Sequence, residues 1–364
     1  MKLIGILSLF LISLGIPFTE NEFGGNEHEL FLFPVSFGGK TGYIDSTGNV
    51  HIDYIFDAGK NFSEGKAAVK MGGKWGYIDT SGKIAIALQY DFAADFHAGQ
   101  ALVGINDRYG FIDKNGTALT GMDFDYGSYF STGFALVRIN GKYNYIDTLG
   151  NFLFPDIIQY GEDFRCGLAY IQEINSHGYI DRTGNVVIKL EPGLYGSSFC
   201  DSMAVVSSED GLFGYIGLDG KIRIPIQYTG ANSFYEGLAG VMAGKQWGFI
   251  DKQGIMAISP QFDDIWFFHS NVCWVMKNGN WGLIDKNGEY LIDSLFDGVS
   301  PVFEEGWCCV RMGNLYHIVN TRGEYLIKDL EEPTSFFHGL ASCRKNGSSF
   351  YIDSNGTVVF ETRD

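Results

Sequence analysis

Proline, cysteine and basic side chains are all scarce in this sequence. Its 364 residues include 8 prolines and 6 cysteines, and 26 lysines and arginines stand against 43 aspartates and glutamates. So little proline excludes a collagen-like chain, which needs abundant proline and glycine at every third place. The net charge of −17 would repel a phosphate backbone, so we expect no nucleic-acid partner.

Long apolar runs are missing after the first 16 residues. Met1 and Lys2 precede an apolar stretch from Leu3 to Ile16, which has the positive start and short apolar core of a secretory signal. We expect residues 1–20 to be a signal peptide, with its cleavage site and an uncleaved anchor left open. The chain would then be exported and soluble, in the periplasm, at the cell surface or outside the cell, with no integral membrane segment after signal removal.

Glycine and aromatic residues are abundant instead. The sequence holds 49 glycines, 6 tryptophans, 20 tyrosines and 30 phenylalanines. This content excludes a disordered chain, which needs few aromatic and apolar residues. It is typical of short strands joined by tight turns.

A block of the form aromatic-Ile-Asp-x-x-Gly recurs along the chain. Successive copies are 34, 34, 34, 34, 36, 34, 34, 35 and 33 residues apart. The ten copies start at Tyr43, Tyr77, Phe111, Tyr145, Tyr179, Tyr215, Phe249, Leu283, Ile318 and Tyr351. We therefore expect one array of ten repeats over residues 31–361 rather than two domains.

A second block, Phe-x-x-Gly-x-Ala-x-Val, keeps the same period. It starts at Phe62, Phe96 and Phe130, and a short glycine turn follows it, such as Gly72-Gly73. The turn leads into Trp-Gly or a variant, as at Trp75-Gly76. The unit Gly-Lys-Trp-Gly-Tyr-Ile-Asp at residues 73–79 resembles the WG, or KWG, repeat family. That resemblance implies a bacterial protein of a family common among exported and surface proteins, and it says little about a ligand.

One repeat predicts three antiparallel strands and a connector. Ala67 and Val69 alternate with their neighbours, which indicates a strand, and Gly72-Gly73 supplies a hairpin turn. Residues 75–79 form the second expected strand and residues 84–86 the third. We expect an all-β fold in which these three-stranded meanders stack as an open β-solenoid or superhelix, with a closed propeller-like ring as the alternative. Known propellers typically have about four to eight blades of four strands. Ten repeats of three strands fit that pattern poorly, which favours the open array.

The repeated aspartates are the strongest candidates for a metal or catalytic site. One aspartate closes the Ile-Asp block in most repeats: Asp45, Asp79, Asp113, Asp147, Asp181, Asp251, Asp285 and Asp353. Calcium needs six to eight oxygen ligands, whereas each turn offers one carboxylate. Turn capping explains the column, and no catalytic grouping of serine, histidine or cysteine stands out. We expect no metal, no cofactor and no enzymatic activity.

The cysteines also predict structure rather than chemistry. None forms a C-x-x-C motif, so a zinc or thioredoxin-type site is unsupported. Cys273 and Cys308 replace the alanine of the second block, so we expect small buried side chains there. Cys308 and Cys309 should alternate to opposite faces of a strand, which argues against a redox pair.

Two variable places offer a candidate recognition surface. The place after the second-block alanine includes Tyr170 and Trp274, and the place two residues later includes Met276 and Arg311. We predict that these side chains lie on a partner-binding face, with unconstrained surface or packing on a neighbouring repeat as the alternatives. Trp266 and Trp307, which lie outside the Trp-Gly position, complete the candidate set.

Two functions remain open from the sequence. The first is a scaffold for protein–protein interaction with an unknown protein partner. The second is a carbohydrate or cell-envelope binding module whose exposed aromatic residues stack on an envelope glycan. Exposure of Trp75, Trp247 and Trp281 separates the two, and we expect these side chains to be mostly buried because a glycine follows each of them.

Overall fold

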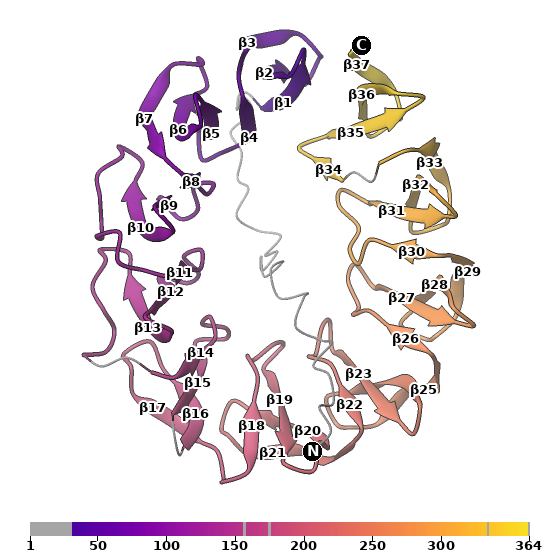
Figure 1. Ribbon diagram of the computed structural model, residues 1–364. Helices are drawn as coiled ribbons and strands as arrows, with labels where there is room; N and C mark the ends of the chain where they lie inside the picture. Colours follow the sequence, from indigo (N-terminus) through magenta and orange to yellow (C-terminus); the bar gives the residue numbers. More distant parts are fainter. Residues whose placement is uncertain (1–30, 156–157, 174–175, 333–334, 363–364) are drawn as a thin grey trace, which may run out of the picture.

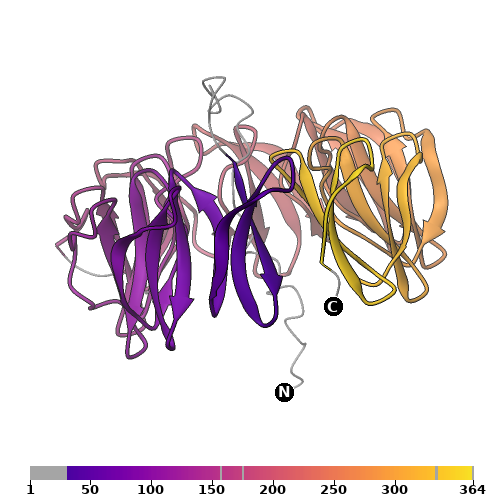
Figure 2. The same ribbon diagram turned by 90° about the horizontal axis from the view of Figure 1, so that it is seen from above.

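The molecule is a ring of small β-sheets arranged round a common axis (Figures 1 and 2). The computed structural model describes residues 31–155, 158–173, 176–332 and 335–362. Ten antiparallel sheets follow one another round the ring, so the fold is a ten-bladed β-propeller. Within these residues no helix is long and apolar enough to cross a membrane. The expected signal peptide, residues 1–20, lies outside them.

The first five blades cover residues 32–189. Blade 1 holds β1 (Leu32–Phe37), β2 (Lys40–Asp45) and β3 (Val50–Phe56), and blade 2 holds β4 (Ala58–Ser63), β5 (Lys66–Met71), β6 (Lys74–Asp79) and β7 (Ile84–Tyr90). Blade 3 holds β8 (Phe92–Ala93), β9 (Gln100–Ile105) and β10 (Arg108–Asp113), and blade 4 holds β11 (Tyr126–Gly127), β12 (Phe134–Ile139) and β13 (Lys142–Asp147). Blade 5 holds β14 (Tyr160–Gly161), β15 (Ala169–Glu173), β16 (Ser176–Ile180) and β17 (Val186–Lys189).

The other five blades each have four strands. Blade 6 holds β18 (Leu194–Gly196), β19 (Met203–Ser208), β20 (Phe213–Gly217) and β21 (Ile222–Tyr228), and blade 7 holds β22 (Gly230–Ala231), β23 (Leu238–Ala243), β24 (Gln246–Asp251) and β25 (Met256–Phe262). Blade 8 holds β26 (Asp264–Ile265), β27 (Val272–Lys277), β28 (Asn280–Asp285) and β29 (Tyr290–Phe296), and blade 9 holds β30 (Gly298–Val299), β31 (Trp307–Met312), β32 (Leu315–Asn320) and β33 (Tyr325–Leu330). Blade 10 holds β34 (Phe336–Phe337), β35 (Leu340–Lys345), β36 (Ser348–Asp353) and β37 (Val358–Thr362).

The first two expected strands of each repeat are present in all ten blades, and the connector contains a strand that the sequence did not predict. In most blades it forms a further short strand beside the axis, such as β8 or β26, so seven of the ten sheets have four strands. In blades 3 and 4 the outermost strand is instead reduced to single bridges, as between Tyr109 and Phe124. Two-residue strands carry too little pattern to be recognised in a sequence.

The glycine of the Trp-Gly signature lets the outermost strand cross close over its neighbour. Trp75 pairs with Tyr90, but Tyr77 pairs with Ile86, so β7 carries extra residues opposite Gly76. A Cβ atom on Gly76 would lie 2.5 Å from the Ile86 carbonyl oxygen. Only glycine fits there, which confirms that this place allows another chain to approach closely.

Each blade is held by the Tyr-Ile-Asp strand of the blade before it. The Tyr77 hydroxyl of blade 2 donates a hydrogen bond to the Ala94 carbonyl of blade 3 at 2.6 Å, and its ring packs 4.8 Å from Phe96. Tyr215 makes the same bond to Asn232 in the next blade at 2.8 Å. The isoleucine or valine that follows is fully buried in all ten repeats: Ile44, Ile78, Ile112, Ile146, Ile180, Ile216, Ile250, Ile284, Val319 and Ile352. These side chains belong to the cores that the blades share.

Blade 10 packs on blade 1, so the ring is closed (Figure 1). The Tyr351 hydroxyl donates to the Pro34 carbonyl of β1 at 2.6 Å, and Phe33, Val35 and Leu340 share one buried cluster. Burial raises the pKa of Tyr351 to about 12, so this hydroxyl keeps its proton. The preferred open array is thus wrong and the alternative closed ring is right.

The glycine of the Asp-x-x-Gly turn provides a test of closure. Gly48 of blade 1 has a φ of +87°, and a Cβ atom there would overlap the Val359 carbonyl oxygen of blade 10. Gly237 has the same φ and no atom within 4 Å of such a Cβ. We expect Gly237→Ala to cost about 1 kcal/mol through backbone strain and Gly48→Ala about 1–3 kcal/mol more through the clash. Thermal unfolding measures both, and equal costs would contradict a closed ring.

Candidate binding surface

The repeated aspartates cap their own turns. In blade 2, Asp79 Oδ1 accepts hydrogen bonds from the amides of Ser81 at 2.9 Å and Lys83 at 3.1 Å and from the Ser81 hydroxyl at 2.6 Å. The Ser81 hydroxyl and these amides hold the pKa of Asp79 below its usual value. In blade 9, Asn320 accepts the same two amide bonds with its neutral side chain. The part of the chain that the structure describes contains no group of side chains suited to a metal ion.

The first variable place lies between blades rather than at the surface. Tyr170 and Trp274 are each only 1% exposed. Trp274 stacks on Phe303 of the next blade with ring centroids 5.7 Å apart, and Tyr170 lies 5.4 Å from Tyr179. The expectation that these two side chains are accessible to a partner is corrected, because this place packs on the neighbouring repeat.

The second variable place reaches the end of the blade. Met276 is half-buried and Arg311 is exposed. Half-buried Trp266 stacks on buried Trp281 at 6.2 Å, and both pack with Met276 against one cluster between blades 8 and 9. The structure thus brings Trp266, Trp274 and Met276 together, whereas Tyr170 lies in blade 5, far round the ring (Figure 1).

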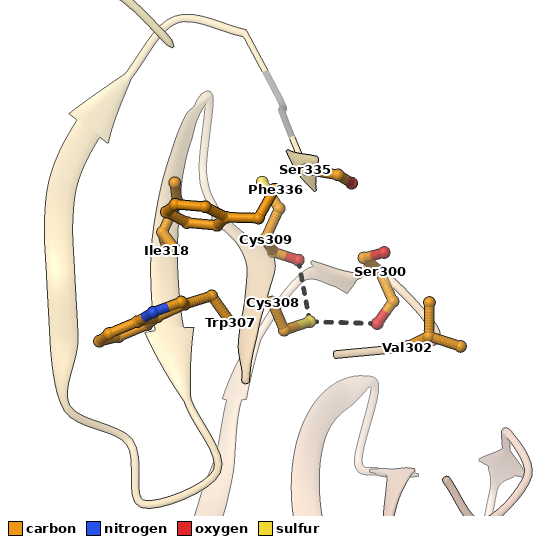
Figure 3. A pocket seen from close by; sticks show the side chains of 8 residues that line it. All are labelled: Ser300, Val302, Trp307, Cys308, Cys309, Ile318, Ser335 and Phe336. Carbon is orange, nitrogen blue, oxygen red and sulfur yellow. Dashed lines mark hydrogen bonds between the residues drawn. The ribbon is translucent and has the colours of Figure 1, made fainter. Parts of the chain in front are cut away.

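Trp307 lines a small pocket between blades 9 and 10 (Figure 3). Cys308 and Cys309 lie beside it, and the Cys308 thiol donates a hydrogen bond to the Ser300 carbonyl at 3.3 Å. Burial raises the pKa of Cys308 well above its usual value, so the thiol stays protonated and unreactive. Cys273 and Cys308 are buried, as predicted.

The tryptophans of the Trp-Gly signature are more enclosed than exposed. Trp281 is buried, while Trp75 and Trp247 are half-buried against the cores between blades. The prediction of burial is therefore confirmed for Trp281 and holds in part for the other two. These side chains offer no row of open rings for stacking on sugars.

A row of aromatic residues that the sequence analysis missed lies at the hairpin end of blades 3–6, the end where the Trp-Gly position lies. We call it the aromatic arc: Phe92, Tyr109, Tyr126, Tyr143, Tyr160, His177 and Tyr195. Its members come alternately from the strand beside the axis and from the strand after the hairpin, at successive separations of 17, 17, 17, 17, 17 and 18 residues. This spacing of half a repeat period was the sequence signal that could have revealed these residues.

Ring contacts join three pairs of residues in the aromatic arc. Phe92 meets Tyr109 edge-on at 5.6 Å within blade 3, and Tyr143 of blade 4 meets Tyr160 of blade 5 edge-on at 5.7 Å. His177 of blade 5 lies 4.7 Å from Tyr195 of blade 6. Phe92, Tyr126 and Tyr195 remain 39, 45 and 40% exposed, which makes the arc an accessible surface.

Arg138 interrupts the arc at its centre. It belongs to the second variable place and lies in register with Tyr126 on one side and Tyr143 on the other. Within the described ranges its guanidinium makes no hydrogen bond or ion pair, and its Nε atom is buried without a partner. The arc therefore combines tyrosine rings with one arginine that has no ion-pair partner among the described residues.

The fold and the repeated signature define a repeat β-propeller, a class that usually serves as a non-catalytic scaffold. The family model described as WG containing repeat matches residues 42–75, 75–109, 109–143, 178–191, 213–246, 247–281 and 281–316. These matches cover more than half of the chain, which therefore belongs to this family, as its resemblance implied. No curated protein matches the sequence.

Several solved structures match this chain at low sequence identity. The chain is similar to a eukaryotic initiation factor, with 11% identity, a TM-score of 0.53, and coverage of 92% of this chain and 96% of that one. At this identity the likeness concerns the fold alone. BamB from Moraxella catarrhalis matches at 13% identity over 71% of this chain and 98% of that one, with a TM-score of 0.34. Hsv2p from Kluyveromyces lactis matches at 8% identity over 72% and 93%, with a TM-score of 0.37.

Turn capping predicts how stability depends on pH. Because the folded-state pKa values of Asp79 and Asp113 are lowered, their contribution is present above the unfolded pKa of about 3.9 and is lost as the pH falls through the folded values. We expect Asp79→Asn with Asp113→Asn to remain folded at pH 7 and to lose less stability than the parent chain between about pH 5 and pH 2. Thermal unfolding across that range is the measurement. Parallel curves, or a shift on adding calcium, would argue against capping.

Burial of Trp274 predicts a structural phenotype. Trp274→Ala removes a ring enclosed between blades 8 and 9, so we expect a loss of about 3–5 kcal/mol in unfolding free energy. The control Leu149→Ala removes a side chain that is 74% exposed and should change stability by less than about 0.5 kcal/mol. Urea denaturation compares the two, and similar midpoints would show that Trp274 is not a core residue.

Proposed function

We propose that this protein is an exported, non-enzymatic repeat scaffold that mediates protein–protein interaction. The observation that carries the proposal is the second variable place. Its residues differ from blade to blade although the blades are built alike, and all of them except buried Gly104 are half-buried or exposed: Lys70, Gly104, Arg138, Gln172, Ser207, Met242, Met276, Arg311 and Arg344.

In repeat proteins, the residues that build the scaffold differ from those that bind a partner. The Tyr-Ile-Asp strand and the Phe block repeat because each blade must seal against the next one. A repeat position that does not pack against the next blade is free to vary. Side chains suited to a particular partner accumulate at such positions. Arginine, methionine and aromatic residues, which recur at this end of the blades, are also enriched in protein interfaces.

Export is the second part of the proposal. Its support is the sequence pattern of residues 1–20, together with the resemblance of the repeats to a family common among exported proteins. Cell fractionation of the full chain expressed in a bacterium tests it. We expect processed protein outside the cytoplasm, and retention of the unprocessed chain in the cytosol would contradict export.

Capture from a bacterial envelope extract tests the scaffold function. The full chain is the bait, each captured protein is identified and purified, and its direct binding is then measured. We expect Met276→Ala combined with Arg311→Ala to weaken direct binding by about tenfold or more, the size expected when interface anchors are removed. Leu149→Ala, an exposed side chain outside the variable places, should bind as the parent chain does. If no identified protein binds directly, the scaffold proposal fails.

A further inference from the structure

We propose that the aromatic arc binds an extended proline-rich peptide segment that carries an acidic residue. The inference rests on the proposed function for the class of partner, and it adds the site and the chemistry of recognition. Its evidence is the orientation of the rings, the tyrosine hydroxyls without partners and the unpaired guanidinium of Arg138.

Neighbouring rings of the arc meet at steep angles. Phe92 and Tyr109 are inclined at 83°, and Tyr143 and Tyr160 at 70°, so each pair meets edge to face. Rings at these angles form an uneven aromatic surface. A polyproline II helix docks on surfaces lined by aromatic residues, and little entropy is lost because its shape is set before binding. Stacking of a sugar ring needs an open ring face, and each edge-to-face contact covers part of one face.

The tyrosine hydroxyls supply hydrogen-bond donors. Among the residues that the structure describes, the hydroxyls of Tyr109, Tyr126, Tyr143 and Tyr195 make no hydrogen bond, whereas that of Tyr160 donates to Glu162 at 3.2 Å. This contrasts with Tyr77, whose hydroxyl is used between blades. A polyproline II backbone has no internal hydrogen bonds, so its carbonyl oxygens are free to accept from these hydroxyls. Burial raises the pKa of Tyr126, which keeps its hydroxyl in the donor form.

Arg138 selects for an acidic residue. Neighbouring Arg108 at the same end of blade 3 is paired with Asp125, whereas Arg138 has no carboxylate partner in the described part of the chain. An arginine flanked by two tyrosines in a chain of net charge −17 is a local exception to the charge of the molecule. A carboxylate on the ligand would pair with its guanidinium by charge-assisted hydrogen bonds.

The arc is confined to one part of the ring. Blades 7, 8 and 9 carry Gly230, Asp264 and Gly298 at the place where blades 3–6 carry Phe92, Tyr126, Tyr160 and Tyr195. The rings therefore follow four consecutive blades on the left and lower parts of Figure 1. Aromatic residues on four consecutive blades suit an extended ligand that contacts several blades in turn.

Direct titration with synthetic probes tests the proposal. The probes are a fluorescent polyproline decapeptide, the same peptide with two aspartates, a glycine-serine decapeptide, cellohexaose and an oligogalacturonate. We expect the acidic proline peptide to bind best, plain polyproline to bind more weakly, and the glycine-serine peptide and both sugars not to bind. Fluorescence anisotropy, with competition by the unlabelled sugars, gives each affinity.

Variants of the arc locate the binding. Tyr126→Ala should weaken both proline peptides by at least about tenfold, and Tyr126→Phe, which keeps the ring, by a smaller factor. Arg138→Gln should weaken the acidic peptide by about tenfold and leave plain polyproline within about twofold. The matched control Tyr290→Ala, a tyrosine 36% exposed on β29, should bind as the parent chain does. Thermal unfolding confirms that each variant is folded.

The possible failures are distinguishable. If neither proline peptide binds, or if Tyr126→Ala and Tyr290→Ala bind alike, the inference is wrong even when envelope proteins are captured. If a sugar binds and Tyr126→Ala abolishes that binding, the arc is a glycan site and the peptide assignment is overturned. If an identified envelope protein binds Tyr126→Ala as tightly as it binds the parent chain, the scaffold function stands and the arc is not its site.

Discussion

The contact between the Tyr-Ile-Asp strand of one blade and the inner part of the next blade stabilises the whole molecule. A sheet of three or four short strands cannot bury enough apolar surface by itself, so each blade needs a neighbour on both sides. The Tyr-Ile-Asp strand meets this need with a buried isoleucine, a ring over the next phenylalanine and, in many blades, a hydroxyl bonded to the next backbone, as Tyr77 is to Ala94. In the closed ring, the first and last blades also have a neighbour on both sides.

Much of the fold was predictable because it is repeated. The period, the three main strands, the glycine at close approach and the buried isoleucine all follow from patterns that ten copies reinforce. Closure did not follow, because it depends on the angle between successive blades, and that angle arises from sheet twist and packing rather than from any one residue. The bond from Tyr351 to Pro34 joins residues at opposite ends of the chain, and no pattern within a repeat indicates it.

The candidate surface was predictable only in part. Variation identified two columns of residues, but it could not tell which column is sealed between blades, so Tyr170 and Trp274 were expected at the surface. The strand beside the axis was not recognised, and the aromatic arc draws four of its seven rings from that strand. Arg138 belonged to a column already singled out, yet its tyrosine neighbours became visible only once the register across the sheet was known.

Closure of the ring is the central claim, and hydrogen–deuterium exchange tests it most directly. In an open array the end repeats fray, because each has a neighbour on one side only. In a closed ring, amides of β2 in blade 1 and β36 in blade 10 should exchange as slowly as those of β20 in blade 6. Mass spectrometry of proteolytic peptides resolves these strands. Faster exchange in both end blades than in blade 6 would contradict the account.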